Sequence, residues 1–136
     1  MIINQTLMDS LSQQAKESPR LRKAFDLRTT PHDSSQRILN AVEPGTILPI
    51  HRHRGSTETI IVLRGKVVQY YYNDAGEKTA SFELAPNSAQ VGMSVPVGQL
   101  HALESLAEGS AIFECKDGAY QPLSAEDILE LAQEGK

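Results

Sequence analysis

Three of the four histidines lie in sequence patterns that suit metal binding. His51 and His53 are two residues apart, so on an extended strand both imidazoles project to the same side. Glu58 follows five residues later, and His101 comes after a Pro-Val-Gly turn at residues 96–98. Three imidazoles and one carboxylate suit a borderline divalent metal. Calcium and magnesium prefer all-oxygen ligand sets. The sequence therefore predicts a transition-metal site.

We expect one divalent transition metal per chain, with zinc, iron, nickel and manganese all compatible with this ligand set. Four protein ligands on a six-coordinate ion leave about two positions for water, substrate or dioxygen. Three hypotheses stay open for such a site. The protein could be an isomerase or epimerase acting on a small polar or sugar-derived molecule, an iron-dependent dioxygenase, or a non-catalytic metal-dependent module that binds a small ligand. A histidine pair on a cationic surface loop is the alternative that involves no metal.

Three further side chains are candidate substrate contacts. Strand parity places Gln69 and Tyr71 on one face of their strand, and that face could line the cavity. The alternative is that the tyrosines at 70–72 provide core or dimer packing, which is what buried aromatic residues mostly do. Glu114 interrupts an apolar strand, where a carboxylate could assist the metal or act as a general base. A charge on an edge strand that faces water is the alternative for Glu114.

Basic residues offer a second kind of binding feature. The cluster Arg20, Arg22 and Lys23 could hold an anionic ligand or form a solvated surface. Arg37 and Arg64 flank predicted strands, where they could bind an anionic substrate or remain ordinary surface residues.

Two other residues have plainer interpretations. His32 lies outside the histidine patterns and is predicted in a loop. Cys115, the single cysteine, is expected to be a buried, inert thiol because free cysteine is usually core.

The elements that must position these residues are mostly short strands. Residues 4–17 carry apolar side chains at helical spacing, and the Ser-Pro pair at 18–19 ends that helix. Residues 36–116 alternate strand-like runs with turn signals, which indicates an all-β sandwich or barrel. A serine followed by acidic residues predicts a C-terminal helix. We expect a single domain, with a helical extension over 1–30, a β-barrel over 31–123 and a helix over 124–136.

One strand carries four consecutive apolar residues, Ile60 to Leu63, so both of its faces should be buried. A second sheet, a terminal helix or a partner subunit would cover the outer face. A homodimer is the expected assembly.

The composition restricts the partners. A net charge of −4 over 136 residues argues against nucleic acid, which requires a basic surface. No apolar run approaches the roughly 18 residues that span a bilayer, and the N-terminus lacks the features of a secretory signal. A single cysteine also fits a reducing compartment. We expect a cytoplasmic protein that binds a small molecule and neither membrane nor nucleic acid.

The spacing of the metal-ligand candidates resembles that of the cupin superfamily. Gly45, His51, His53, Glu58 and Gly65 reproduce the first cupin motif, G-x5-H-x-H-x3,4-E-x6-G, with no position missing. The second motif, G-x5-P-x-G-x2-H-x3-N, is partly kept, with departures at its first and last positions. Pro96, Gly98 and His101 match the motif. Gln90 stands at the position of its first glycine, and Ser105 stands at the position of its final asparagine.

From about residue 18 to residue 123 the chain resembles the WbuC family of small cupin-fold metalloproteins. Stretches that carry the resemblance include QRILNAVEPGTILPIHRH and PVGQLHALESLAEGSAIFECKDGAY. The resemblance implies a double-stranded β-helix, or jelly-roll barrel, with a bound transition metal. It also implies an association with O-antigen-like surface polysaccharide biosynthesis, without identifying a reaction.

Overall fold

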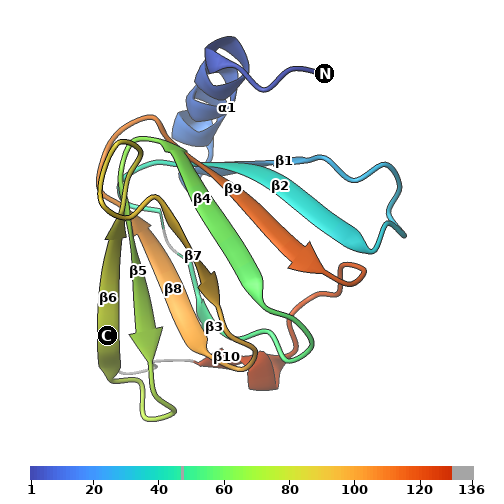
Figure 1. Ribbon diagram of the computed structural model, residues 1–136, viewed down its shortest axis with the longest axis vertical. Helices are drawn as coiled ribbons and strands as arrows, with labels where there is room; N and C mark the ends of the chain where they lie inside the picture. The colour runs from blue at the N-terminus through green and yellow to red at the C-terminus, as the bar shows by residue number, and fades with distance from the viewer. Residues whose placement is uncertain (47, 130–136) are drawn as a thin grey trace.

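Two five-stranded antiparallel sheets that face each other form the body of the protein (Figure 1), in a computed structural model that describes residues 1–46 and 48–129. The first sheet has the order β1-β2-β9-β4-β7, with bounds Arg22–Asp26, Ser35–Val42, Ser110–Asp117, Glu58–Arg64 and Gly92–Val95. The second has the order β10-β3-β8-β5-β6, with bounds Ile128–Leu129, Ile50–His51, Leu100–Ser105, Val67–Tyr72 and Lys78–Leu84. The predicted all-β class with a jelly-roll barrel is confirmed.

The space between the sheets is apolar at one end and polar at the other. The apolar end is a cluster of seven buried side chains from both sheets: Val42, Ile60, Val62, Val67, Leu84, Leu103 and Ile112. Because alternate residues of a strand point to the same face, each inward row can be followed along its strand. Three such rows change from apolar to polar toward the same end of the barrel: β4 runs from Val62 to Glu58, β9 from Ile112 to Lys116, and β8 from Leu103 to His101.

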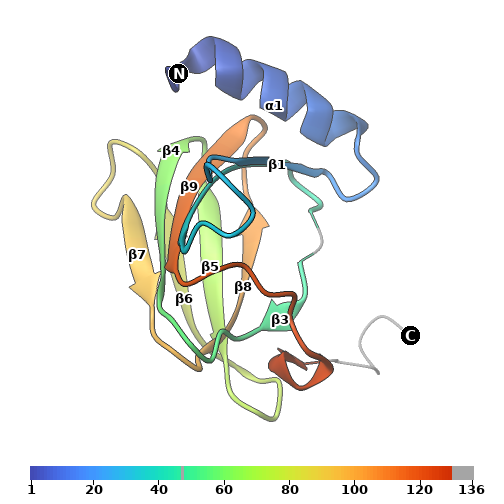
Figure 2. The ribbon, with the colours of Figure 1, turned by 90° about the vertical axis from the view of Figure 1, so that its right-hand side faces the viewer.

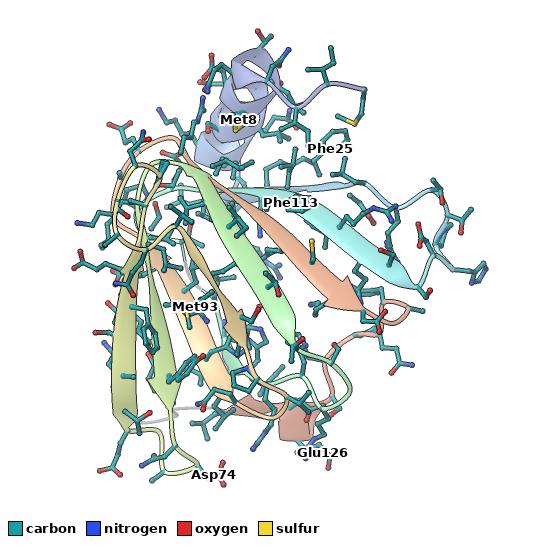
Figure 3. The ribbon with its side chains drawn as sticks, viewed as in Figure 1. Met8, Phe25, Asp74, Met93, Phe113 and Glu126 are labelled. Atoms are coloured by element: carbon teal, nitrogen blue, oxygen red, sulfur yellow. The ribbon has the colours of Figure 1, made fainter. Side chains whose placement is uncertain are left out.

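One helix, α1 (Gln5–Glu17), lies against the outer face of the first sheet over β1, β2 and β9 (Figure 2). The side chain of Asn4 caps it by accepting a hydrogen bond from the Leu7 amide at 2.9 Å. Its apolar stripe packs on β2 and β9, and Figure 3 shows Phe25 and Phe113 in the layer beneath the helix. Within the described ranges, no helix is long and apolar enough to cross a membrane.

The apolar strand β4 is only partly covered on its outer side. Leu63 packs into the cluster beneath α1, whereas Ile61 keeps 37% of its surface exposed. A terminal helix therefore provides part of the predicted cover, and the homodimer stays a prediction.

The chain termini differ from the expected helical segments. Within residues 1–30, α1 is followed by β1, which pairs with β2 and extends the first sheet. The C-terminal helix predicted for 124–136 is wrong over its described part. Residues Ala125–Asp127 form a single 3-10 turn, and Ile128–Leu129 form strand β10; residues 130–136 lie outside the described ranges.

Strand pairing with a distant part of the chain explains why residues 124–129 do not form the predicted helix. The strand β10 pairs with the open edge of β3, and Leu129 packs beside Ile50, Leu100 and Ala102. The Ser124 hydroxyl donates to the Asp127 carboxylate at 2.9 Å instead of capping a backbone amide. Strand pairing at β3 thus overrides the local helix signal.

Candidate metal centre

Cross-strand pairing brings His51 and His101 together. His51 ends β3 and lies directly opposite His101 in the ladder with β8, so the two rings share one face of the sheet. Their ring centroids are 4.3 Å apart, and the centroid of His53 lies 5.0 Å from that of His51 and 5.6 Å from that of His101. Each ring offers one nitrogen, and these three atoms all lie within 4.8 Å of one another. The sequence-predicted triad of imidazoles therefore converges in space.

Backbone carbonyls fix the orientation of two of these rings. The Nδ1 of His51 lies 2.9 Å from the Pro49 carbonyl oxygen, and the Nδ1 of His101 lies 2.8 Å from that of Gln99. A carbonyl oxygen can only accept, so each Nδ1 carries a proton. The Nε2 atom of a neutral ring then keeps its lone pair, which is the arrangement seen in metal-binding histidines.

The surroundings also favour neutral, ligand-competent rings. Burial lowers the pKa of His51, assisted by the nearby His101. Burial and the charge of Lys116 lower the pKa of His53 to about 4. Metal binding requires neutral imidazole, so near neutral pH neither of these rings has to lose a proton before it binds an ion.

Glu58, at the start of β4 in the opposite sheet, completes the group. Its Oε1 lies 3.3 Å from Nε2 of His101, and its Oε2 lies 3.7 Å from Nε2 of His53. Ligands about 2.1 Å from one ion are separated by about 3.0 Å at octahedral and 3.4 Å at tetrahedral angles, so both distances are near those of neighbouring ligands. Burial opposes ionisation of Glu58, but the hydrogen bond from His101 and the charge of Lys116 prevail and lower its pKa to about 2.

These residues fit a transition metal on the chemistry of the donor set. Because Nδ1 of His101 donates to Gln99, its Nε2 and the Glu58 carboxylate, 3.3 Å apart, need a cation between them, either a proton or a metal ion. In addition, Nε2 of His53 is buried and has no hydrogen-bond partner within the described residues. His51, His53, His101 and Glu58 would hold the ion, which would supply Lewis-acid activation of a bound water, carbonyl or hydroxyl.

The four residues line a cavity of about 360 Å³ at the polar end of the barrel. Gln69 and Glu114 also line it, which places two of the three predicted substrate contacts beside the histidines. The third, Tyr71, is not among the lining residues, and its ring packs against Phe82 with centroids 5.0 Å apart. The packing alternative describes Tyr71 better.

Glu114 faces the inside of the barrel because it shares the inward row of β9 with Ile112 and Lys116, and β9 lies in the middle of its sheet, between β2 and β4. An edge-strand charge facing water is therefore not its setting. Burial and the charge of Glu58 raise the pKa of Glu114 to about 7, although Lys116 and the Asn40 side chain act in the opposite direction. A carboxyl with such a pKa can exist in either protonation state near neutral pH.

Lys116 and Asn40 are among the lining residues that sequence reasoning missed. Lys116 lies opposite Glu58 in the β4–β9 ladder, with its Nζ 3.4 Å from the carboxylate. Asn40 comes from β2, and its Oδ1 is buried without a partner among the described residues. Lys116 follows Glu114 by two residues, so strand parity was the signal that could have found it. Nothing in the local sequence of Asn40 marks it.

The other arginines singled out from the sequence have different surroundings. Arg64 donates to the Gly109 carbonyl at 2.7 Å and pairs with Asp9 of α1 at 2.7 Å, so it joins the helix to the barrel. Arg37 pairs with Asp33 at 2.9 Å. Arg22, in contrast, lines the cavity together with the histidines.

Two residues lie away from the cavity, and one of them corrects an expectation. His32 is exposed in a loop. Cys115 is only partly buried, which differs from the expected core thiol; it lies opposite Arg37 and Thr59 on the face of β9 that points away from Glu114.

Comparison with known proteins gives a family and a fold. A family model described as "Domain of unknown function (DUF6016)" matches residues 3–84, which is more than half of the chain and includes His51, His53 and Glu58. No curated protein sequence matches the chain at a significant level.

Solved structures share the cupin fold. The capsular polysaccharide assembling protein CapF from Staphylococcus aureus superposes with a TM-score of 0.65 at 20% identity, covering 82% of this chain and 32% of that one. Recombinant oxalate oxidase in complex with glycolate gives 0.62 at 13% identity, covering 79% and 56%. KdgF from Halomonas sp. gives 0.58 at 16% identity, covering 76% and 84%. The matched region is therefore about a third of CapF. These likenesses establish the cupin double-stranded β-helix.

Proposed function

The chain belongs to the family described as Domain of unknown function (DUF6016), and we propose that it is a metal-binding cupin whose transition metal engages a small polar or sugar-derived molecule. One observation carries the proposal. Three imidazole nitrogens converge within 4.8 Å on the wall of a cavity of about 360 Å³, a volume typical of small-molecule sites. A purely structural metal would not need a cavity of this size beside it.

The biological setting that we propose is surface polysaccharide biosynthesis. Part of CapF, a capsular polysaccharide assembling protein, is similar in structure to this chain. The similarity covers 82% of this chain. The resemblance of residues 18–123 to the WbuC family points the same way. We propose that this chain is WbuC-like on the basis of the stretches QRILNAVEPGTILPIHRH and PVGQLHALESLAEGSAIFECKDGAY.

Metal analysis of purified variants tests the proposal. We expect about one equivalent of a first-row transition metal per chain in the wild-type protein, and loss of most of it in His53→Ala and His101→Ala. The matched control is His32→Ala, which removes an exposed loop histidine and should keep the full metal content. Equal metal content in all three variants, or none in the wild type even after soaking with metal, would refute the metal centre.

The identity of the metal then separates the chemistries. Zinc, nickel or manganese without oxygen uptake supports Lewis-acid chemistry or binding of the small molecule. Iron together with oxygen consumption in the presence of candidate substrates would replace the proposal with a dioxygenase.

A further inference from the structure

The charges that line the metal cavity are nearly balanced before an ion is added. The Lys116 ammonium faces the Glu58 carboxylate at 3.4 Å, so these two charges compensate each other. Arg22 and Glu114 are the remaining charged residues of the lining, apart from the histidines. Burial and the charge of Arg20 lower the pKa of Arg22, and the attraction of Glu114 acts in the opposite direction. A bound divalent cation therefore leaves the cavity with an excess of at least about two positive charges, which an anionic ligand would offset.

Arg22 has a free guanidinium with which to bind such an anion. No described residue makes a hydrogen bond or an ion pair with the side chain of Arg22, Arg20 or Lys23. In this respect Arg22 differs from Arg28, Arg37, Arg54 and Arg64, each of which pairs with an aspartate. A guanidinium presents paired N–H donors that match the oxygens of a carboxylate or a phosphate.

Arg22 also stands between two hollows. It lines the metal cavity, and with Asn40 it lines a surface hollow whose wall includes Arg20 and Lys23. The strand β1 holds Arg22 at this position, because Arg22 pairs with Val42 of β2, a core residue, and so faces inward. A ligand in the metal cavity thus meets Arg22 at the side where Arg20 and Lys23 add further positive charge.

Unpaired polar groups supply further contacts. Gln69 is 2% exposed, and its Nε2 has no hydrogen-bond partner among the described residues, although it lies in the wall of the metal cavity. Buried amides are normally satisfied, so this donor is suited to an oxygen of the ligand. The Oδ1 of Asn40 is likewise unpaired and can accept from a hydroxyl.

We propose that the molecule bound at the metal centre is a hydroxyl-bearing anion whose carboxylate or phosphate group is held by the guanidinium of Arg22. Gln69 and Asn40 contact its other oxygens, and the metal ion lies at the opposite end of the ligand. A sphere of 360 Å³ is about 9 Å across, so the cavity accepts a molecule of about the size of a monosaccharide acid or phosphate. This inference rests on the proposed function, because it concerns the same metal site.

Calorimetric titration of the metal-loaded full chain tests the assignment with two pairs of probes. Glycolate is compared with ethylene glycol, and glycerol 3-phosphate with glycerol, so that each pair differs mainly in the anionic group. We expect at least one anion to bind with a Kd at least tenfold below that of its neutral counterpart. The pair with the larger ratio identifies the carboxylate or the phosphate as the group that is recognised.

Variants then test the residue. Arg22→Met should raise the Kd of the preferred anion at least tenfold without changing the metal content, and Arg22→Lys should recover part of the affinity because it restores the charge. The control is Lys66→Met, which removes an exposed positive charge that pairs with Glu83 outside this cavity and should leave the Kd within twofold.

Two results would overturn the inference. One is a metal-loaded protein that binds neither anion more tightly than its neutral counterpart, and the other is an Arg22→Met variant with an unchanged Kd. In both cases the metal content remains at one equivalent, so the proposed function stands while the anion assignment falls. A wild-type protein that takes up no metal would instead refute the proposed function itself.

Discussion

Replacing Gln69 with leucine should stabilise the metal-free protein. Gln69 is 2% exposed, and its Nε2 donor has no partner among the described residues. A buried polar group without a partner costs about 1–3 kcal/mol of stability. Leucine has nearly the same volume and no polar atoms, and it would face Leu103, its cross-strand neighbour on β8. We therefore expect the free energy of unfolding to rise by about 1–2 kcal/mol.

This gain should be visible as a shift of the melting temperature. An unfolding entropy of about 2.1 cal/mol/K per residue gives about 0.29 kcal/mol/K for 136 residues, so 1 kcal/mol corresponds to about 3–4 °C. Gln69→Leu should then melt about 3–7 °C above the wild type. The measurement is thermal and urea denaturation, followed by circular dichroism, of protein treated with a chelator.

Gln36 provides the matched control. It is 7% exposed and is also on a strand, but its Nε2 donates to the Gly118 carbonyl at 3.0 Å. Gln36→Leu breaks this hydrogen bond and should lower the free energy of unfolding by about 1 kcal/mol. Opposite signs for the two variants would support the reasoning. Destabilisation of similar size in both would refute it, because Gln69 would then have a partner inside the protein.

Two further predictions concern a titrating group and a turn. In the metal-free protein, Glu114 has a pKa of about 7, so the folded state binds more protons than the unfolded state between about pH 4.5 and 7, and its stability falls as the pH rises through that window. Glu114→Gln should remove this fall, so that above pH 7 its free energy of unfolding exceeds that of the wild type by up to about 3 kcal/mol. Urea titrations at several pH values measure this difference. A difference that does not vary with pH would contradict the prediction. Gly65 has φ +81° and a Cβ there would lie 2.6 Å from Cα of Ser110, so Gly65→Ala should cost about 3 kcal/mol in the same denaturation assay. Gly55→Ala, with no atom within 4 Å of the added Cβ, should cost less than about 1 kcal/mol, and equal losses would exclude the clash.

The metal-ligand candidates that the sequence predicted are positioned mainly by local backbone geometry. His51 and His53 are two residues apart, and their ring centroids lie 5.0 Å apart even though β3 ends at His51. Gly65 is required where the motif has it, since its backbone has a positive φ and an added Cβ would clash with Ser110. His101 joins them through a single cross-strand register, His51 opposite His101, which the order of the two motifs anticipates without specifying.

The rest of the fold and cavity depends on contacts between distant segments. The 3-10 turn and β10 replace part of the predicted C-terminal helix because the edge of β3 offers strand pairing, which no window of residues 124–129 reveals. Asn40 lines the cavity only because β2 lies next to β9 in the first sheet. Such adjacency follows from the topology of the barrel, and the local composition of β2 contains no sign of it.

The distribution of unpaired polar atoms links the stability of the barrel to its ligand. Four buried side-chain atoms have no hydrogen-bond partner within the described residues, and three of them, on Asn40, His53 and Gln69, belong to residues that line the metal cavity. Each lowers the stability of the free protein, since buried polar groups are otherwise satisfied. Their different chemistry, one acceptor, one imidazole nitrogen and one donor, matches a metal ion together with a ligand that carries both hydroxyl and anionic oxygens. Binding of the metal and the ligand would therefore provide partners for these atoms and stabilise this end of the barrel. Metal and anion together should raise the melting temperature by more than the metal alone.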